Sequence, residues 1–520
     1  MTRPAPQDIA AGAIAAAFAA ACSLFVWQPT LATFADDSVS YLVMAQEFSP
    51  FQPASPAVAG AFAREAFYPP LFPLVLALAG AAHNVAWAHA LTALLLAAAL
   101  PFAYLLGVRW LESRGAALAA MACLALLPSL WINSKGILSE PLFCLLLVAT
   151  FFFLDREEKP GWKLALVMAG LALTRTAALP MLAVYGLWAL ARRGTWQARM
   201  RAAAPALAAY AAYGLWVLVR PAQTEDDYAR IVLDRGQGFF GGPDGFWVAL
   251  AASLARQANA IAEGWAGSLL LYWVEGQPLR FALASLAGLL ALAGIAIRLR
   301  RGKADGWMSA AYLATLMAWP FYDQMERFLF PLLPALVLYA FFAAGELLRA
   351  LSRRPAIAHA LLAALLLTLS LPAMAFIYQR AQAGGRTAEI TDWYRTPDAA
   401  RARLRAQTHI SLQDDMQAIR ALTQPRDRVM WVAPSYIALL ADRQGLAAPD
   451  ARLDPAAYRD AVRKSGAGYV FLSRYHPRDT IRDSAWQSGV RALAAEAKAV
   501  YTGTLDEGSV VTSILLQVPK

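Results

Sequence analysis

Charged side chains are scarce in this chain of 520 residues: Asp, Glu, Lys and Arg together make up 16% of it. Hydrophobic residues account for 59%, and the mean hydropathy is +0.43, which excludes an average soluble domain. Cysteine is rare as well. All three residues, Cys22, Cys123 and Cys144, fall in apolar stretches, so the sequence predicts neither a disulfide framework nor a CxxC metal site.

Several functional motifs are also missing. The five histidines are scattered without an HExxH motif or another paired spacing, so no zinc site is predicted. No GxxxxGKS/T phosphate loop occurs, which argues against a step driven by a cytosolic nucleotide. The net charge of +10 comes with no nucleic-acid-binding motif, and we expect no nucleic acid among the partners.

Long apolar runs are what the chain has instead. They are long enough to cross about 30 Å of hydrocarbon, and their Ala and Leu content favours helices over the alternating strands of a membrane barrel. The sequence therefore predicts an α-helical polytopic membrane bundle of about 11 transmembrane helices. The predicted spans are residues 8–27, 84–108, 115–133, 140–154, 163–174, 177–191, 202–219, 279–297, 308–322, 328–348 and 357–378. The first is expected to be an uncleaved span rather than a signal peptide.

Basic residues gather in alternate connections between these spans. One side holds sixteen of them: Arg109, Arg114, Arg156, Lys159, Lys163, Arg192, Arg193, Arg199, Arg201, Arg298, Arg300, Arg301, Lys303, Arg349, Arg353 and Arg354. The short loops opposite hold four: Arg64, Lys135, Arg175 and Arg327. Because cytoplasmic loops are enriched in Lys and Arg, this asymmetry predicts a cytoplasmic N-terminus.

The predicted domain boundary lies at residues 378/379. Residues 1–378 form the membrane domain, with long outer loops at 28–83 and 220–278, the second having a composition suited to a mobile loop over a site. From residue 379 a helical stretch at 412–422 alternates with β-rich runs at 428–432 and 468–472, and two late runs, 499–504 and 509–518, suggest an antiparallel pair. The sequence therefore predicts a small C-terminal α/β soluble domain at 379–520, outside the membrane and, in a bacterium, periplasmic.

Two adjacent carboxylates follow the first span. Asp36 and Asp37 stand beside lipid-seeking sequence, where unpaired charge is costly unless it has a function. A structural alternative is that one of them caps a helix beginning at Ser38, since Asp is a favoured N-cap residue. In a helix, neighbouring side chains diverge by about 100°, so only one of the pair is expected to point into a cavity.

Five short motifs in order resemble the C superfamily of membrane glycosyltransferases, in particular bacterial members similar to protein O-mannosyltransferases and lipid A aminoarabinose transferases. The acidic pair is followed by Tyr41, Leu42 and Ala45, then by Tyr68-Pro69-Pro70-Leu71-Phe72-Pro73, Ser139-Glu140-Pro141-Leu142-Phe143, Leu173-Thr174-Arg175 and Arg327-Phe328-Leu329-Phe330-Pro331. The resemblance covers roughly residues 5–380, and the tail resembles the outer domain that many members carry.

This resemblance implies transfer of a sugar from a polyprenyl-phosphate donor to a lipid, glycan or protein acceptor at the outer face of the inner membrane, commonly with inversion. A carboxylate must then take a proton from the acceptor hydroxyl, and Asp37 is preferred over Asp36 for that role by its place in the pattern. Because neighbouring carboxylates repel, the pair is alternatively expected to bind an arginine or a divalent cation.

The resemblance also implies residues that contact the substrates. Glu140 would face the donor or acceptor, although Ser139-Glu140-Pro141 also suits a simple helix start. Arg175 and Arg327 would neutralise the phosphate leaving group, with Arg280 as a weaker third. The alternatives are that Arg175 reaches lipid headgroups and that Arg327 pairs locally with Asp323 or Glu326. Tyr68 would shape the substrate entrance, or the prolines after it would only start a helix.

Two other functions remain open at this stage. A transporter or flippase of lipid-linked sugars would also have many spans and charged cavity residues, but the chain has no clear internal repeat. An inactive assembly partner with the same fold is the third hypothesis. Membrane lipids are expected neighbours in every case.

Overall fold

The structure is a computed structural model that describes residues 4–33, 36–156, 161–221, 246–271, 277–319, 321–351, 354–450, 453–473, 485–493, 496–505 and 510–519. Its contacts divide the chain into two compact units. We call Met1–Trp27, Pro69–Phe72 and His89–Gln379 the helical unit, and Gln28–Tyr68, Pro73–Ala88 and Arg380–Lys520 the mixed unit. We call Arg380–Lys520 the C-terminal segment. Residues that follow the first span in sequence therefore belong to the same compact unit as this segment.

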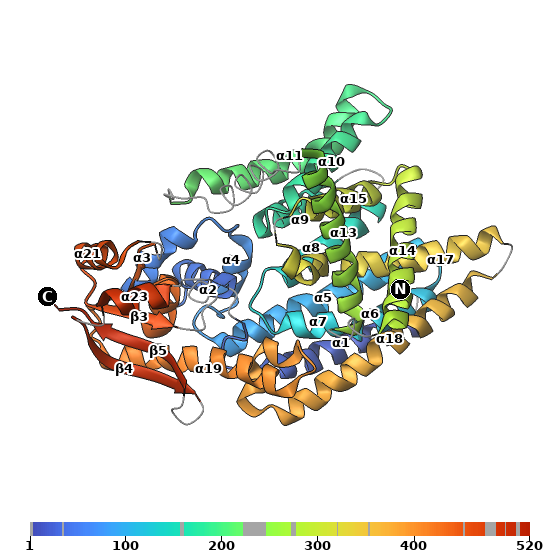
Figure 1. The fold of residues 1–520 in the computed structure, drawn as a ribbon. Coiled ribbons are helices and arrows are strands. Elements are labelled where there is room, and N and C mark those ends of the chain that lie inside the picture. Colours follow the sequence, from blue (N-terminus) through green and yellow to red (C-terminus); the bar gives the residue numbers. More distant parts are fainter. Residues whose placement is uncertain are drawn as a thin grey trace. The chain divides into compact units, whose positions relative to one another are not determined.

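Helices make up the whole regular structure of the helical unit, as Figure 1 shows for its described part. They are α1 (Pro6–Val26), α5 (Val85–Leu111), α6 (Arg114–Ala125), α7 (Pro128–Ser134), α8 (Glu140–Arg156), α9 (Trp162–Thr174), α10 (Ala178–Ala191), α11 (Trp196–Val219), α13 (Phe246–Leu270), α14 (Pro278–Arg300), α15 (Ala304–Met317), η1 (Tyr322–Gln324), α16 (Met325–Leu329), η2 (Phe330–Leu332), α17 (Leu333–Ala350) and α18 (Pro355–Ala383).

Six stretches among the described residues are long and apolar enough to cross a membrane, or seven if the bent pair α6 and α7 counts as one span. The pair bends by 50°, and Pro128 opens its second half. The predicted number of eleven is not confirmed. Helix α9 has 13 residues and α10 has 14, which at 1.5 Å per residue gives about 20 Å, less than the hydrocarbon thickness of about 30 Å.

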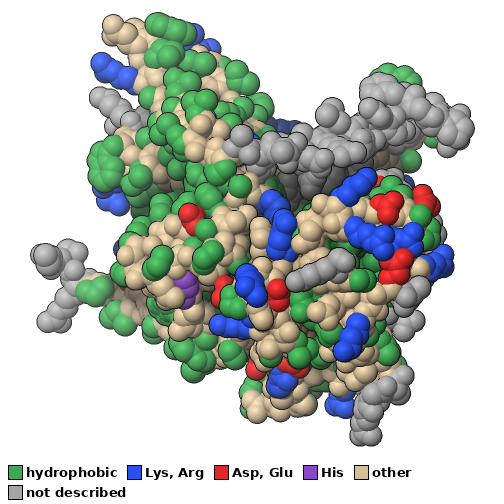
Figure 2. Space-filling model, turned by 90° about the vertical axis from the view of Figure 1, so that its left-hand side faces the viewer, with side chains coloured by type: hydrophobic (Ala, Val, Ile, Leu, Met, Phe, Trp, Pro, Cys, Tyr) green, Lys and Arg blue, Asp and Glu red, His purple; other side chains and the backbone are tan. Residues whose placement is uncertain are grey.

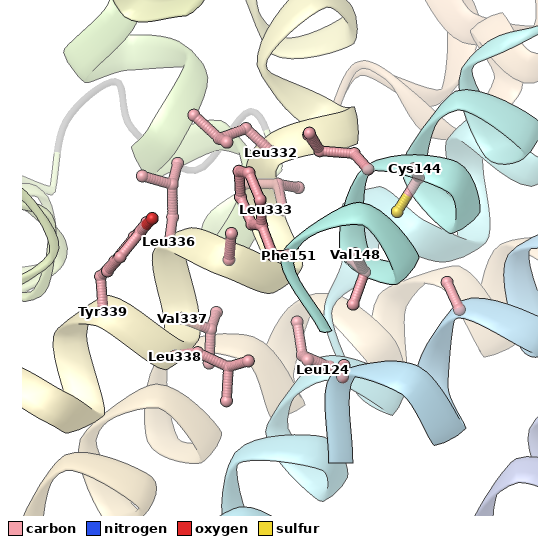
Figure 3. Close-up of a cluster of buried hydrophobic side chains, with 14 of the residues drawn as sticks. Leu124, Cys144, Val148, Phe151, Leu332, Leu333, Leu336, Val337, Leu338 and Tyr339 are labelled. Carbon is pink, nitrogen blue, oxygen red and sulfur yellow. The ribbon is translucent and has the colours of Figure 1, made fainter. Parts of the chain in front are cut away.

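The core of the helical unit lies around α17. Every residue of this helix from Leu333 to Gly345 is buried. In Figure 3, Val148 and Phe151 of α8 lie near Leu333 and Val337, with Leu124 of α6 close by. Helix α14 approaches α17 so closely that a Cβ at Gly294 would meet the Tyr339 carbonyl oxygen at 2.3 Å. Small residues permit such backbone contacts between membrane helices.

One buried ion pair joins α14 and α15. Arg298 donates through Nε to Asp305 at 2.5 Å and through Nη2 at 2.8 Å, and both side chains are nearly inaccessible. The Tyr339 hydroxyl donates to the same carboxylate at 2.9 Å, and the guanidinium lies 4.0 Å from the Trp110 ring centroid. The hydrogen bonds and the ring contact compensate the charges of Arg298 and Asp305, whose burial without partners would be costly.

The two expected outer loops are helical in part. Residues 28–83 contain α2 (Asp36–Phe48), α3 (Pro56–Glu65) and α4 (Leu71–Leu78). Within 220–278, residues 222–245 lie outside the described part, and α13 occupies most of the remainder as a 25-residue helix. Ser55 caps α3 by accepting from the Val58 N–H, and Pro56 follows at its first position, which explains where that helix starts.

The C-terminal segment folds as an α/β layer around five strands. They are β1 (Arg428–Trp431), β2 (Gln444–Ala447), β3 (Tyr469–Ser473), β4 (Lys498–Leu505) and β5 (Val510–Gln517), in the order β2-β1-β3-β5-β4. Strand β1 pairs in parallel with β2 and β3, while β5 pairs antiparallel with β3 and β4. The predicted small α/β fold and its late antiparallel pair are confirmed, and β2 was not predicted.

Helices accompany this sheet. They are η3 (Gly385–Glu389), η4 (Thr391–Tyr394), α19 (Ala399–Leu422), α20 (Pro434–Tyr436), η5 (Ile437–Ala441), α21 (Pro455–Ser465) and α23 (Ala485–Leu493). Figure 2 looks onto the side where Figure 1 labels α21 and α23, and there Lys and Arg are interspersed with Asp and Glu. Mixed charge of this kind is typical of a water-exposed surface.

Candidate functional site

Two clusters contain most of the predicted site residues, one in each unit. The Glu140 cluster, in the helical unit, consists of Ser139, Glu140, Arg175, Arg327 and Phe328. It begins where α8 begins: the Ser139 carbonyl accepts from the Phe143 N–H at 3.0 Å, and Glu140 follows in the first turn. The predicted helix start is confirmed. A carboxylate in that position also interacts favourably with the helix dipole.

Glu140 binds both predicted arginines through one oxygen. Arg175 Nη1 lies 2.9 Å from Oε1, and Arg327 Nε lies 2.5 Å from the same atom. The Glu140 side chain is 2% exposed and each arginine side chain 14%. Arg175 therefore extends into the protein rather than to lipid headgroups. Arg327 pairs with Glu140, far along the chain, and not with Asp323 or Glu326 as the alternative hypothesis required.

Neighbouring groups hold the arginines in place. Arg175 follows α9 in extended conformation, and its Nη1 also donates to Ser139 Oγ at 3.0 Å. The Phe328 ring lies 6.0 Å from the Arg175 guanidinium carbon and 5.8 Å from that of Arg327. Glu140 Oε2 is buried and has no hydrogen-bond partner in the described part of the chain. The guanidinium groups of Arg175 and Arg327 are planar and cationic, and they lie side by side at one buried carboxylate. Such a pair of guanidinium groups is chemically suited to bind an oxyanion such as phosphate.

The Asp37 cluster, in the mixed unit, is built on α2. The helix begins at Asp36, two residues earlier than the capping hypothesis required, so both acids lie in its first turn. Asp37 is half-buried, and the Tyr68 hydroxyl donates to its Oδ1 at 2.7 Å. The Asp36 side chain lies outside the described residues. Tyr68, predicted at the substrate entrance, thus contacts the preferred acid directly.

Two aromatic rings pack against the ring of Tyr68. The Tyr41 and Tyr68 rings meet edge to face with centroids 5.2 Å apart, and Phe67 lies 4.1 Å from Tyr68. These contacts hold the phenol that donates to the half-buried Asp37 carboxylate. A general base must be positioned before it can act, and the Tyr68 contact limits the positions of the Asp37 carboxylate.

Sequence reasoning missed Glu65. This residue ends α3, and its Oε2 accepts from Ser40 Oγ at 2.5 Å. Its Oε1 accepts from Ser435 Oγ in α20, 370 positions along the chain. No local pattern signals a contact of such separation, because a single Glu at a helix end usually faces water.

The remaining predictions concern Arg280 and a cation. Arg280 lies half-buried in the first turn of α14 and is not among the described contacts of Glu140. Among the side chains that the structure describes, no three His, Cys, Asp or Glu residues are grouped so as to hold a metal ion. That Asp36 and Asp37 bind a divalent cation stays a prediction.

Comparisons with known proteins concern the family and the fold of the chain. The family model for dolichyl-phosphate-mannose-protein mannosyltransferase matches residues 39–204. The structure of ArnT from Cupriavidus metallidurans in the apo state superposes with a TM-score of 0.53 over 97% of both chains, at 12% identity. The chain has the ArnT fold. The resemblance that the five motifs suggested is therefore confirmed.

Two further structures are similar. ArnT from the same organism bound to undecaprenyl phosphate gives a TM-score of 0.52 at 11% identity, again over 97% of both chains. The archaeal oligosaccharyltransferase AglB from Archaeoglobus fulgidus, in complex with an inhibitory peptide and a dolichol-phosphate, gives 0.44 at 14% identity, covering 88% of this chain and 69% of that one. No curated protein sequence matches the chain significantly. The family-model match and the shared fold together indicate a multi-span membrane glycosyltransferase.

Proposed function

We propose that this protein transfers a sugar from a polyprenyl-phosphate-linked donor to an acceptor at the outer face of a bacterial inner membrane, with inversion at the anomeric carbon. The observation that carries the proposal is the agreement with the ArnT fold over 97% of both chains, because a complex of that protein holds undecaprenyl phosphate. The acceptor is a lipid, a glycan or a protein, since one scaffold serves many acceptors.

Asp37 is the general base in this proposal. The attacking hydroxyl of the acceptor must lose its proton as the new glycosidic bond forms, and a carboxylate within hydrogen-bond distance takes that proton. Support comes from the half-buried position of Asp37 and from the Tyr68 hydroxyl that fixes it at 2.7 Å. Asp36 shares the first turn and is the second candidate.

Arg175 and Arg327 bind the phosphate of the donor. As the bond to the sugar breaks, negative charge grows on that phosphate, and preorganised guanidinium groups stabilise it where water is scarce. Support comes from the low exposure of both side chains and from their common contact with Glu140. Glu140 and Arg280 would complete the contacts with the substrates, Arg280 with the weaker support.

The proposed topology places the N-terminus in the cytoplasm and the C-terminal segment in the periplasm. It requires an odd number of crossings, and eleven is the number that the hydropathy pattern predicts. The sixteen basic residues on one side support this orientation through the positive-inside rule.

Reconstituted vesicles test the activity. The purified chain is supplied with undecaprenyl phosphate carrying either mannose or aminoarabinose, together with an envelope extract as acceptor. We expect sugar to move from one of these donors to a component of the extract. Donor that is only moved across the bilayer, with no sugar transferred, would instead identify a flippase and contradict the proposal.

A further inference from the structure

The end of α3 touches α2 at two points one helical turn apart. The Tyr68 hydroxyl donates to Asp37, and Glu65 Oε2 accepts from Ser40 Oγ. Asp37 and Ser40 are three residues apart and therefore lie on the same face of α2. The Tyr68 N–H donates to the Glu65 carbonyl at 3.2 Å, so both contacting side chains belong to a single closed turn.

The same turn is bonded to the C-terminal segment. Glu65 Oε1 accepts from Ser435 Oγ in α20, and Arg64 Nη1 donates to the Gly445 carbonyl of β2 at 3.3 Å. Ser40 is 3% exposed and Ser435 7% exposed, so water competes little for these bonds. One carboxylate thus joins α2 to a segment almost 400 residues away in sequence.

The position of Ser435 is itself tightly determined. A Cβ at Gly445 would meet the Pro434 carbonyl oxygen at 2.0 Å, so β2 passes directly against the start of α20. Only glycine permits this approach, and it fixes the Ser435 backbone relative to the edge of the sheet. A displacement of the sheet edge would therefore move the Ser435 hydroxyl from which Glu65 accepts a hydrogen bond.

We propose that Glu65 is a positioning residue, which transmits the placement of the C-terminal segment through Ser435 and Ser40 to α2, while Tyr68 fixes the orientation of Asp37. This inference depends on the proposed function, because it needs Asp37 to act as the base. Its consequence is that the C-terminal segment sets the rate of transfer without itself contacting the reacting atoms.

Variants of the full chain in vesicles test the device. Glu65→Gln removes the charge, and one of the two serine contacts must reverse so that the amide nitrogen donates to the serine oxygen, which weakens both links. Ser435→Ala removes only the link to the C-terminal segment. We expect kcat to fall about tenfold in each, with the donor KM unchanged within about twofold, since small misplacements of a reacting group cost rate rather than binding. Both serines act through Glu65. The double variant Glu65→Gln/Ser435→Ala should therefore lose less kcat, as a fold-change, than the product of the losses in the two single variants.

Two controls make the result decisive. Glu47→Gln changes an exposed carboxylate on the same helix and should leave kcat at the wild-type value. Tyr68→Phe should lower kcat and move the acidic limb of the pH–rate profile to higher pH, because a donor to the carboxylate is lost. A purely structural role for Glu65 would lower thermal stability and activity together, whereas the positioning role lowers kcat while thermal stability and donor KM stay near the wild-type values.

Two outcomes overturn the inference in different ways. Wild-type kcat in Glu65→Gln and Ser435→Ala, alongside an inactive Asp37→Asn, would remove the positioning role and leave the proposed function standing. Wild-type transfer by Asp36→Asn, by Asp37→Asn and by the double variant would remove both, because no base would remain to be positioned.

Discussion

Arg327 donates to Glu140 across 187 positions of the chain, with 2.5 Å between Nε and Oε1. Arg175 reaches the same oxygen from the end of α9. The contact brings together the start of α8 and the broken helical stretch of α16 and η2 that leads into α17. Two residues that the motifs singled out separately are thus parts of a single buried cluster.

Arginine replacement should weaken use of the donor. We expect Arg175→Ala and Arg327→Ala to lower kcat/KM for the polyprenyl-phosphate sugar by about 100-fold or more, with a smaller effect on the acceptor KM, because charge-assisted hydrogen bonds to phosphate are lost. Arg327→Lys should recover part of the rate, since lysine keeps the charge but not the planar fork. Equal losses for donor and acceptor would mean that the arginines only support the fold.

The buried ion pair between α14 and α15 should matter for stability. Arg298→Gln leaves Asp305 buried beside Tyr339 without its main partner, and we expect a loss of about 3–5 kcal/mol in the free energy of unfolding. The control is Arg114→Gln, which breaks an exposed pair with Asp8 and should leave the stability almost unchanged, because water screens exposed pairs. Thermal unfolding in detergent compares the two, and equal stabilities would contradict this account of the pair.

Gly294 should not tolerate even alanine. Its missing Cβ leaves room for the Tyr339 carbonyl, so Gly294→Ala forces α14 away from α17 and should lower the midpoint of thermal unfolding by several degrees. Gly214→Ala in α11, where a Cβ would meet nothing within 4 Å, is the matched control and should be neutral or slightly stabilising. If both variants unfold at the same temperature, the close approach of α14 to α17 is not present.

The C-terminal segment should lose stability as the pH rises. Burial raises the pKa of Asp415 to about 6 from 3.8, although the hydrogen bond from Tyr501 acts in the opposite direction. Between about pH 4 and pH 6 the unfolded chain has therefore released a proton that the folded chain keeps, so stability falls with rising pH by up to about 3 kcal/mol. Asp415→Asn removes this dependence. Its advantage over the wild type should be larger at pH 7.5 than at pH 4.5 in thermal unfolding, and a constant difference would contradict the prediction.

Local patterns predicted what depends on local physics. The strands β1, β3, β4 and β5 follow from runs of β-branched and aromatic residues, whereas β2, with the sequence Gln-Gly-Leu-Ala, has no such signal and forms through its pairing with β1. Helix starts at Glu140 and near the acidic pair followed from residue types that favour first turns.

Contacts between distant residues were beyond that reasoning. The motifs identified Glu140, Arg175 and Arg327 as candidates, but their meeting at one oxygen depends on how α8, α9 and α16 pack. Glu65 was missed for the same reason, because its partner Ser435 is far away in sequence. The predicted number of spans is not confirmed, because apolar composition alone does not distinguish a full crossing from a short buried helix such as α9.

The rate of sugar transfer by Asp37→Asn tests the central claim most directly. Asparagine keeps the size of the side chain and can still accept from Tyr68, but it cannot take a proton from the acceptor hydroxyl. We expect transfer in donor-loaded vesicles to fall at least about 100-fold, with expression and donor binding unchanged. Wild-type rates in Asp36→Asn, Asp37→Asn and the double variant would contradict the assignment of a general base to this acidic pair.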